Sequence, residues 1–122
     1  MKNALNWFEI PVSDFRRAKN FYEAILNTSM DIMEIPGYQA AMFPADLENG
    51  IGGCIMYGEG YEPSNKGSII YLNAGADLND ALGRITMAGG QIIQAKTSIG
   101  ENGFMALFED TEGNKAALHS NA

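Results

Sequence analysis

An internal repeat constrains the fold of this chain more than any other feature of its sequence. Residues 6–57 have the pattern of a strand, a helix and three further strands, and residues 68–119 have the same order again. Four positions at the start of the two helices correspond at one constant offset: Asp14, Phe15, Ala18 and Tyr22 match Asp77, Leu78, Ala81 and Ile85. A repeat restricts topology more than a single predicted element does. We therefore predict an α+β domain of residues 1–122, built from two tandem β-α-β-β-β modules over about 4–58 and 67–121.

The boundaries of the predicted elements follow from apolar periodicity and from turn residues. In the first half we predict a helix that Ser13 caps and Asn27 ends, because Phe15, Ala18 and Tyr22 fall on one face. Its strands are predicted at residues 6–12, 30–35, 38–43 and 51–57. In the second half a helix over 77–88 should stop at Gly89-Gly90. The strands there are predicted at residues 68–74, 91–96, 103–109 and 115–119.

Charge, cysteine and histidine content exclude several classes of function. The chain has 122 residues and a net charge of −7, which argues against binding to nucleic acid or to an anionic membrane surface. A single cysteine, Cys54, excludes an intrachain disulfide and fits a reducing compartment, so we expect a cytoplasmic protein with an inert buried thiol. A single histidine, His119, excludes iron and zinc sites that need two histidines from one chain.

The first strand carries the most informative candidate residue, Glu9. Phe8, Ile10 and Val12 form an apolar face that should pack on a helix, which leaves Glu9 on the opposite face beside Trp7. A carboxylate in that position is either partly desolvated or paired with a donor. As a functional group it would be a general base or a substrate anchor. As a structural group it would accept a hydrogen bond, for example from Tyr71.

Four other side chains are candidate binding residues, each with a structural alternative. Trp7 would stack on a planar ligand, or it would plug the core. Tyr71 and Asn73 share a strand face opposite Leu72 and would anchor a ligand, or they would satisfy neighbouring backbone groups. Lys96 would bind an anionic ligand, or it would be solvated.

His119 is a further catalytic candidate, with less support than Glu9. It shares a strand face with Ala117 near the carboxyl end of the chain. A lone histidine is more often satisfied by a structural partner or faces solvent.

Three motifs resemble the vicinal oxygen chelate superfamily, which includes glyoxalases, bleomycin-resistance proteins and extradiol dioxygenases. These are W-F-E-I-P-V-x-D with R-A-x-x-F-Y (residues 7–22), A-G-G-Q (88–91) and F-x-D-T-E-G-N-x-x-x-L-H-S (108–120). The resemblance covers essentially the whole chain and implies that the two modules form a glyoxalase-like cleft, within one chain or between two. It also implies a homodimer.

Metal-dependent members of this superfamily place four ligands on equivalent strands, on the sheet faces that line the cleft. The corresponding positions here are Trp7, Ile55 or Met56, Ile69 or Ile70, and Ala117. None of these side chains is a plausible ligand for a divalent metal. We therefore expect no metal and no other cofactor.

Two functions are compatible with this sequence. In the first, the protein binds a small organic molecule in a cleft, in the manner of a bleomycin-resistance protein, without its superfamily's usual metal. In the second, it is a glyoxalase-like lyase or isomerase that acts on a small carbonyl or oxygenated compound with Glu9 as the base.

Overall fold

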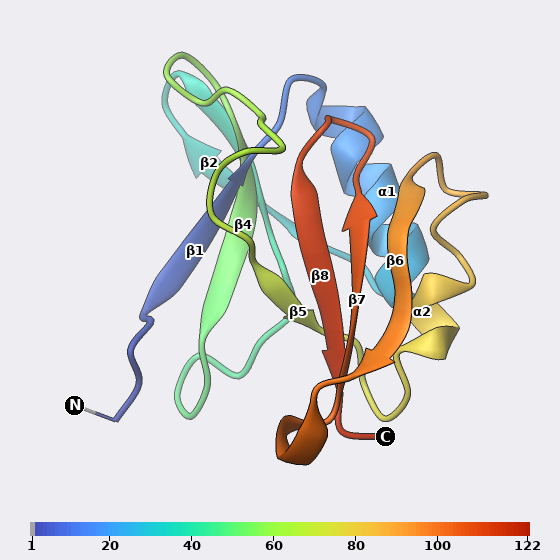
Figure 1. Cartoon of the computed structure of the whole chain (residues 1–122). Coiled ribbons are helices and arrows are strands. Elements are labelled where there is room, and N and C mark those ends of the chain that lie inside the picture. The colour runs from blue at the N-terminus through green and yellow to red at the C-terminus, as the bar shows by residue number, and fades with distance from the viewer. Residues whose placement is uncertain (1) are drawn as a thin grey trace.

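The computed structural model describes residues 2–122 and contains two four-stranded sheets with their helices (Figure 1). The first module comprises β1 (Trp7–Pro11), α1 (Phe15–Leu26), β2 (Asp31–Ile35), β3 (Tyr38–Met42) and β4 (Gly52–Tyr57). The second comprises β5 (Tyr71–Asn73), α2 (Asn79–Leu82), β6 (Gln91–Ser98), the 3₁₀ turn η1 (Gly100–Asn102), β7 (Phe104–Glu109) and β8 (Lys115–Ser120). The predicted α+β class and the repeated strand order are confirmed.

The two sheets have the same topology. Their strand orders are β1-β4-β3-β2 and β5-β8-β7-β6, and the first strand of each pairs in parallel with the last. The other neighbours are antiparallel. β1 is an edge strand that ends at Pro11, as predicted for a strand with a proline, which lacks the N–H needed for a continuous ladder.

The predicted cap of α1 is wrong by one residue. Asp14, not Ser13, is the N-cap, and its side chain accepts a hydrogen bond from the Arg17 N–H. Ser13 instead turns its N–H and hydroxyl toward Glu112. The other end is as predicted: Asn27 is the C-cap with φ 50°, in the left-handed region that asparagine tolerates better than most residues.

The second module is less regular than its pattern predicts. The helix covers only residues 79–82 rather than 77–88, because Gly83 interrupts it and the chain continues in turns closed by short-range hydrogen bonds, such as Arg84 N–H to Ala81 O. β5 is also shorter than predicted. β6 runs on to Ser98, and its register with β7 shifts twice.

Both modules contribute to one hydrophobic core. Phe21 and Tyr22 of α1 are fully buried, and they contact Phe108 of β7 and Phe43, the residue after β3, through edge-on and tilted ring contacts. Burying a side chain of this size contributes about 1.5–3 kcal/mol. In Figure 1, α1 lies beside β6 and β7 although it belongs to the first module. Since α1 packs on both sheets, the opposite face of each sheet is turned away from the shared core.

Candidate ligand-binding site

The face of the first sheet that points away from the core carries an aromatic and sulfur-rich surface. We call this surface the first outer face; it is formed by Trp7, Glu9, Met33, Ile35, Tyr38, Ala40, Cys54, Met56 and Tyr61. Ala40, Cys54 and Met56 form its buried base, and Trp7, Met33 and Tyr61 pack against them. Tyr61 comes from the linker between the modules, so the linker covers part of this face.

Glu9 is exposed, and its partner is not the predicted one. Its Oε1 accepts a hydrogen bond of 2.9 Å from the Tyr61 hydroxyl rather than from Tyr71. This hydrogen bond raises the pKa of Tyr61. Tyr61 also packs edge-on against Tyr38, with ring centroids 5.9 Å apart. Within residues 2–122, Glu9 forms no ion pair.

Trp7 lies beside Glu9 and is partly buried. A Cβ added to Gly52 would lie 3.3 Å from the indole Cζ3, so this glycine permits the indole to lie close to β4. Cys54 is fully buried below this surface. Burial and the nearby Glu9 charge raise the pKa of its thiol to about 11, and the predicted burial of this thiol is confirmed.

The second sheet also has an outer face, which holds three of the predicted residues. Tyr71, Asn73 and His119 line an open cavity of about 260 Å³ with the chain end at Ser120 and Asn121. Leu72 is buried in the core, so Tyr71 and Asn73 point outward, as their alternation predicts. His119 Nε2 donates to the carbonyl oxygen of Asn102 at 2.6 Å.

Lys96 is separated from the other candidate residues. Its Nζ pairs with Asp77 Oδ1 at 3.0 Å and lies 4.6 Å from the centre of the Phe104 ring. Phe104 packs against the shared core, so Lys96 lies on the side of its sheet that faces this core. The structure therefore gathers the candidates into two groups, with Trp7 and Glu9 on one outer face and Tyr71, Asn73 and His119 on the other.

Sequence reasoning missed Tyr61 and Tyr38 as members of the site. Tyr61 lies between Gly60 and Glu62 in a polar linker, and no periodic pattern assigns it to a surface. The only available signal was a large aromatic residue in an otherwise polar segment. Its position is decided by the hydrogen bond to Glu9, 52 residues away.

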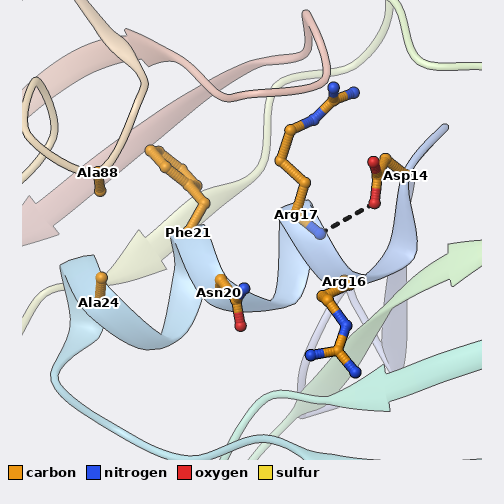
Figure 2. A pocket seen from close by; sticks show the side chains of 7 residues that line it. All are labelled: Asp14, Arg16, Arg17, Asn20, Phe21, Ala24 and Ala88. Atoms are coloured by element: carbon orange, nitrogen blue, oxygen red, sulfur yellow. Dashed lines mark hydrogen bonds between the residues drawn. The ribbon is translucent and has the colours of Figure 1, made fainter.

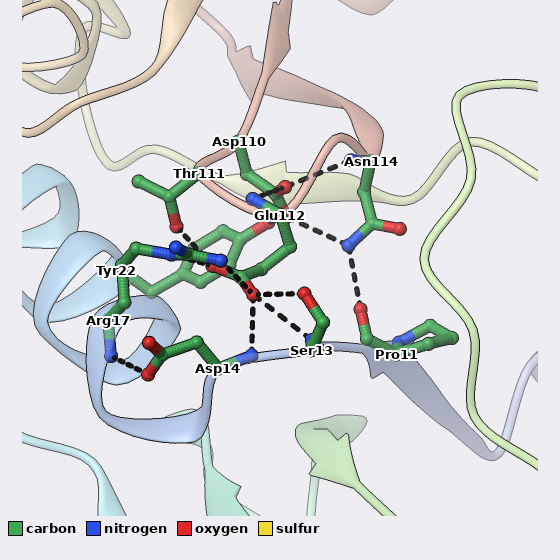
Figure 3. A network of polar contacts seen from close by, with 9 residues as sticks. All are labelled: Pro11, Ser13, Asp14, Arg17, Tyr22, Asp110, Thr111, Glu112 and Asn114. Carbon is green, nitrogen blue, oxygen red and sulfur yellow. Dashed lines mark hydrogen bonds and ion pairs between the residues drawn. The ribbon is translucent and has the colours of Figure 1, made fainter.

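A polar network joins the turn between β7 and β8 to the start of α1 (Figure 3). Glu112 accepts hydrogen bonds from Ser13, Asp14, Arg17 and Thr111, at 2.7–3.1 Å. Burial raises the pKa of Glu112, but these donors outweigh burial and hold the pKa at about 2. In this arrangement Glu112 ties the two modules together.

The remaining members of the network join the same turn to α1 and to β1. Asp110 accepts a hydrogen bond of 2.6 Å from the buried Tyr22 hydroxyl, and burial and the Asp110 charge raise the pKa of that phenol. Asn114 donates 2.8 Å to the carbonyl oxygen of Pro11. Among residues 2–122, no buried side-chain nitrogen or oxygen atom lacks a hydrogen-bond partner, so this network leaves no buried polar group open to a ligand.

A shallow groove of about 480 Å³ lies along α1, opposite the loop that holds Ala88 (Figure 2). Arg16, Arg17 and Asn20 line it, above the edge of Phe21. Arg17 Nε is bound to Glu112 at 2.8 Å. None of the predicted site residues lines this groove.

The strand registers also resolve which side chains occupy the predicted metal-ligand positions. Ile55 belongs to the shared core, and Ile70 packs against it, so the outward positions are those of Met56 and Ile69, together with Trp7 and Ala117. Among residues 2–122 no group of three or more His, Cys, Asp or Glu side chains is arranged to hold a metal ion. No helix in that range is long and apolar enough to cross a membrane.

The paired β-α-β-β-β modules define the class of protein, and the family model for the Glyoxalase/Bleomycin resistance protein/Dioxygenase superfamily matches residues 4–118. The chain belongs to that superfamily. The resemblance found in the sequence is therefore confirmed. A comparison with curated proteins found no match.

Solved structures share the fold at low sequence identity. A glyoxalase/bleomycin resistance protein/dioxygenase family enzyme from Burkholderia phytofirmans PsJN is 15% identical, with a TM-score of 0.69 over 96% of this chain and 98% of that one. The fosfomycin resistance protein FosX from Listeria monocytogenes is 18% identical, with a TM-score of 0.67 over 100% and 96%. Glyoxalase I from Zea mays is 23% identical, with a TM-score of 0.68, and this chain spans 46% of it.

Proposed function

We propose that this protein binds a small organic molecule on the first outer face, without a metal ion. The observation that carries this proposal is the composition of that face. An indole, two phenols and two thioethers share this face with one carboxylate that forms no ion pair within residues 2–122. Adaptable apolar walls with a small number of polar groups are typical of ligand sites.

The residues at the predicted ligand positions support a metal-independent site. Trp7, Met56, Ile69 and Ala117 offer an indole, a thioether and two aliphatic groups, and these do not fit the oxygen, nitrogen or thiolate donors that divalent metals prefer. No step of the proposed function uses a metal.

We further propose a homodimer in which each cleft is shared between two copies. Both outer faces are turned away from the core of their own chain, and within residues 2–122 the linker at Tyr61 covers only part of the first. If the second outer face of one copy lies against the first outer face of another, Tyr71, Asn73 and His119 would face Trp7 and Glu9. A two-fold axis would produce two such clefts. The lone buried thiol of Cys54 is compatible with the cytoplasm as the compartment.

Native mass spectrometry of protein purified without chelator or added metal tests this proposal. We expect the mass of a metal-free dimer. A stoichiometric transition metal, bound through ligands other than the four outward positions, would overturn the metal-independent site. A monomer at micromolar concentration would overturn the shared cleft.

The Glu9–Tyr61 pair also supports the alternative function, a glyoxalase-like lyase or isomerase. Glu9 is exposed and its Oε1 lies 2.9 Å from the Tyr61 hydroxyl, so the pair places a carboxylate beside a hydroxyl group, a base beside a proton donor. Glu9→Gln separates the two functions once a ligand is known. Loss of turnover with unchanged affinity would establish the enzyme, whereas a change in affinity alone would establish the binding protein.

A further inference from the structure

The charge and the aromatic rings of the first outer face point to one class of ligand. Glu9 uses Oε1 to accept the hydrogen bond from Tyr61, and within residues 2–122 its Oε2 accepts none. No basic side chain in that range lies within 4.0 Å of it. The carboxylate therefore keeps one oxygen available to a ligand, and no side chain of residues 2–122 forms an ion pair with it.

The rings around this carboxylate are those that bind organic cations. Trp7 lies two residues from Glu9 on the same strand face, and Tyr61 contacts Glu9 directly. Tyr38 packs edge-on against Tyr61 at 82°, so the two phenol rings stand nearly perpendicular. Aromatic faces beside a carboxylate attract quaternary and protonated amines through the ring quadrupole.

The cavity next to Glu9 has the same sign of charge. Its volume is about 200 Å³, and its charged lining residues are Glu9, Glu62 and Lys115. This cavity lies between the two modules, beside Ile10, Ile70 and Ala116, and among the described residues Glu9 is the member of the first outer face that lines it. Two carboxylates and one ammonium group leave an excess of negative charge there. Opposite charge beside a concave surface raises the local concentration of a cationic ligand.

We infer that the first outer face binds a small organic ammonium ion, with its charge at Glu9 Oε2 and its alkyl groups against Trp7, Tyr38 and Tyr61. This inference rests on the proposed binding function and names its ligand class. Tyr61 is then a binding residue that orients Glu9 through Oε1 and leaves Oε2 free. The class includes choline-like and aryl-trimethylammonium compounds.

Fluorescence of Trp7, the only tryptophan of the chain, tests this inference on the full-length protein. The probes are choline, benzyltrimethylammonium, the neutral choline isostere 3,3-dimethylbutan-1-ol, and the anion 3,3-dimethylbutyrate. We expect choline to bind at least tenfold more tightly than its neutral isostere, and benzyltrimethylammonium to bind more tightly still. Raising the ionic strength should weaken both cations and leave the alcohol unchanged.

Variants of the carboxylate identify the site. Glu9→Gln should remove the tenfold preference for choline while the affinity for the alcohol is unchanged, whereas Glu9→Asp should retain part of the preference. Glu34→Gln is the matched control: it removes one charge from the same sheet, from a residue of β2 whose side chain alternates with those of Met33 and Ile35 on the first outer face. Tyr61→Ala should weaken both cations, and Tyr61→Phe should weaken them less because the ring remains.

The outcomes separate this inference from the proposed function. Equal affinity of choline and its neutral isostere, or a choline preference that survives Glu9→Gln, would overturn the ammonium class while binding of a small molecule stands. If none of the four probes changes the Trp7 emission at millimolar concentration, the ammonium class and the proposed binding face are both overturned. Preference for the anion would also overturn the ammonium class, and it would leave the binding face intact.

Discussion

Two glutamates of this chain, Glu112 and Glu9, have the same chemistry and opposite surroundings. Glu112 is buried, pairs with Arg17 and accepts hydrogen bonds from four residues at the junction of the two modules. Glu9 is exposed, has one hydrogen-bond donor and forms no ion pair within residues 2–122. The protein itself satisfies the first carboxylate, which therefore contributes to stability. The second carboxylate has a donor on only one of its oxygens, and its other oxygen remains available for a ligand.

Removal of the buried carboxylate should have the largest effect on the free energy of unfolding. Glu112→Ala should lower the free energy of unfolding by about 3 kcal/mol, because it removes an acceptor shared by Ser13, Asp14 and Arg17 and hydrogen bonds to a charged group are worth about 1.5–3 kcal/mol. Urea unfolding followed by circular dichroism measures this change. Glu34→Ala, on the exposed β2 strand, should change it by less than about 0.5 kcal/mol. Similar losses in the two variants would contradict the structural role of Glu112.

Acid should have the next largest effect, through the same group. The pKa of Glu112 lies at about 2 in the folded protein, below its ordinary value of 4.5. The stability that this shift contributes is fully present above about pH 4.5 and is lost as the pH falls toward 2. It amounts to about 3 kcal/mol at neutral pH. Urea unfolding at pH 7, 4.5 and 3 should show this loss, and the Glu112→Gln variant should show a shallower pH dependence.

A single hydroxyl of the network gives a smaller effect. Tyr22→Phe keeps the buried ring but removes the 2.6 Å hydrogen bond to Asp110. We expect a loss of about 1.5–3 kcal/mol, because a hydrogen bond to a charged group is worth about that amount. Tyr61→Phe provides the comparison, since Tyr61 also donates to a carboxylate but on an exposed surface. It should cost less than a third as much by urea unfolding.

The smallest expected effect is that of Glu9 on stability. Glu9→Gln should change the free energy of unfolding by less than about 0.5 kcal/mol, because the residue is exposed and loses no ion pair within the described chain. Thermal and urea unfolding would both detect a larger loss. A loss above about 2 kcal/mol would show that Glu9 is structural, as Glu112 is.

The sequence by itself determined the local geometry of this protein. Alternation along residues 7–12 placed Trp7 and Glu9 opposite Ile10, and the spacing of Phe15, Ala18 and Tyr22 predicted α1. The repeat predicted that each module contains one helix and four strands in the same order along the chain. These features follow from the periods of strands and helices, which are properties of neighbouring residues. Where a glycine and short-range bonds competed with that periodicity, at residues 83–89, the predicted helix was too long.

Only the tertiary structure decided how the two modules dock and which residues meet. Packing of α1 on both sheets turned the outer faces away from each other, and this depends on the shapes of Phe21, Tyr22 and Phe108. The partner of Glu9 proved to be Tyr61 and not Tyr71, and Lys96 joined Asp77. Contacts of this kind join segments far apart in the chain. They depend on complementary volume and hydrogen bonding in three dimensions, which no local period encodes.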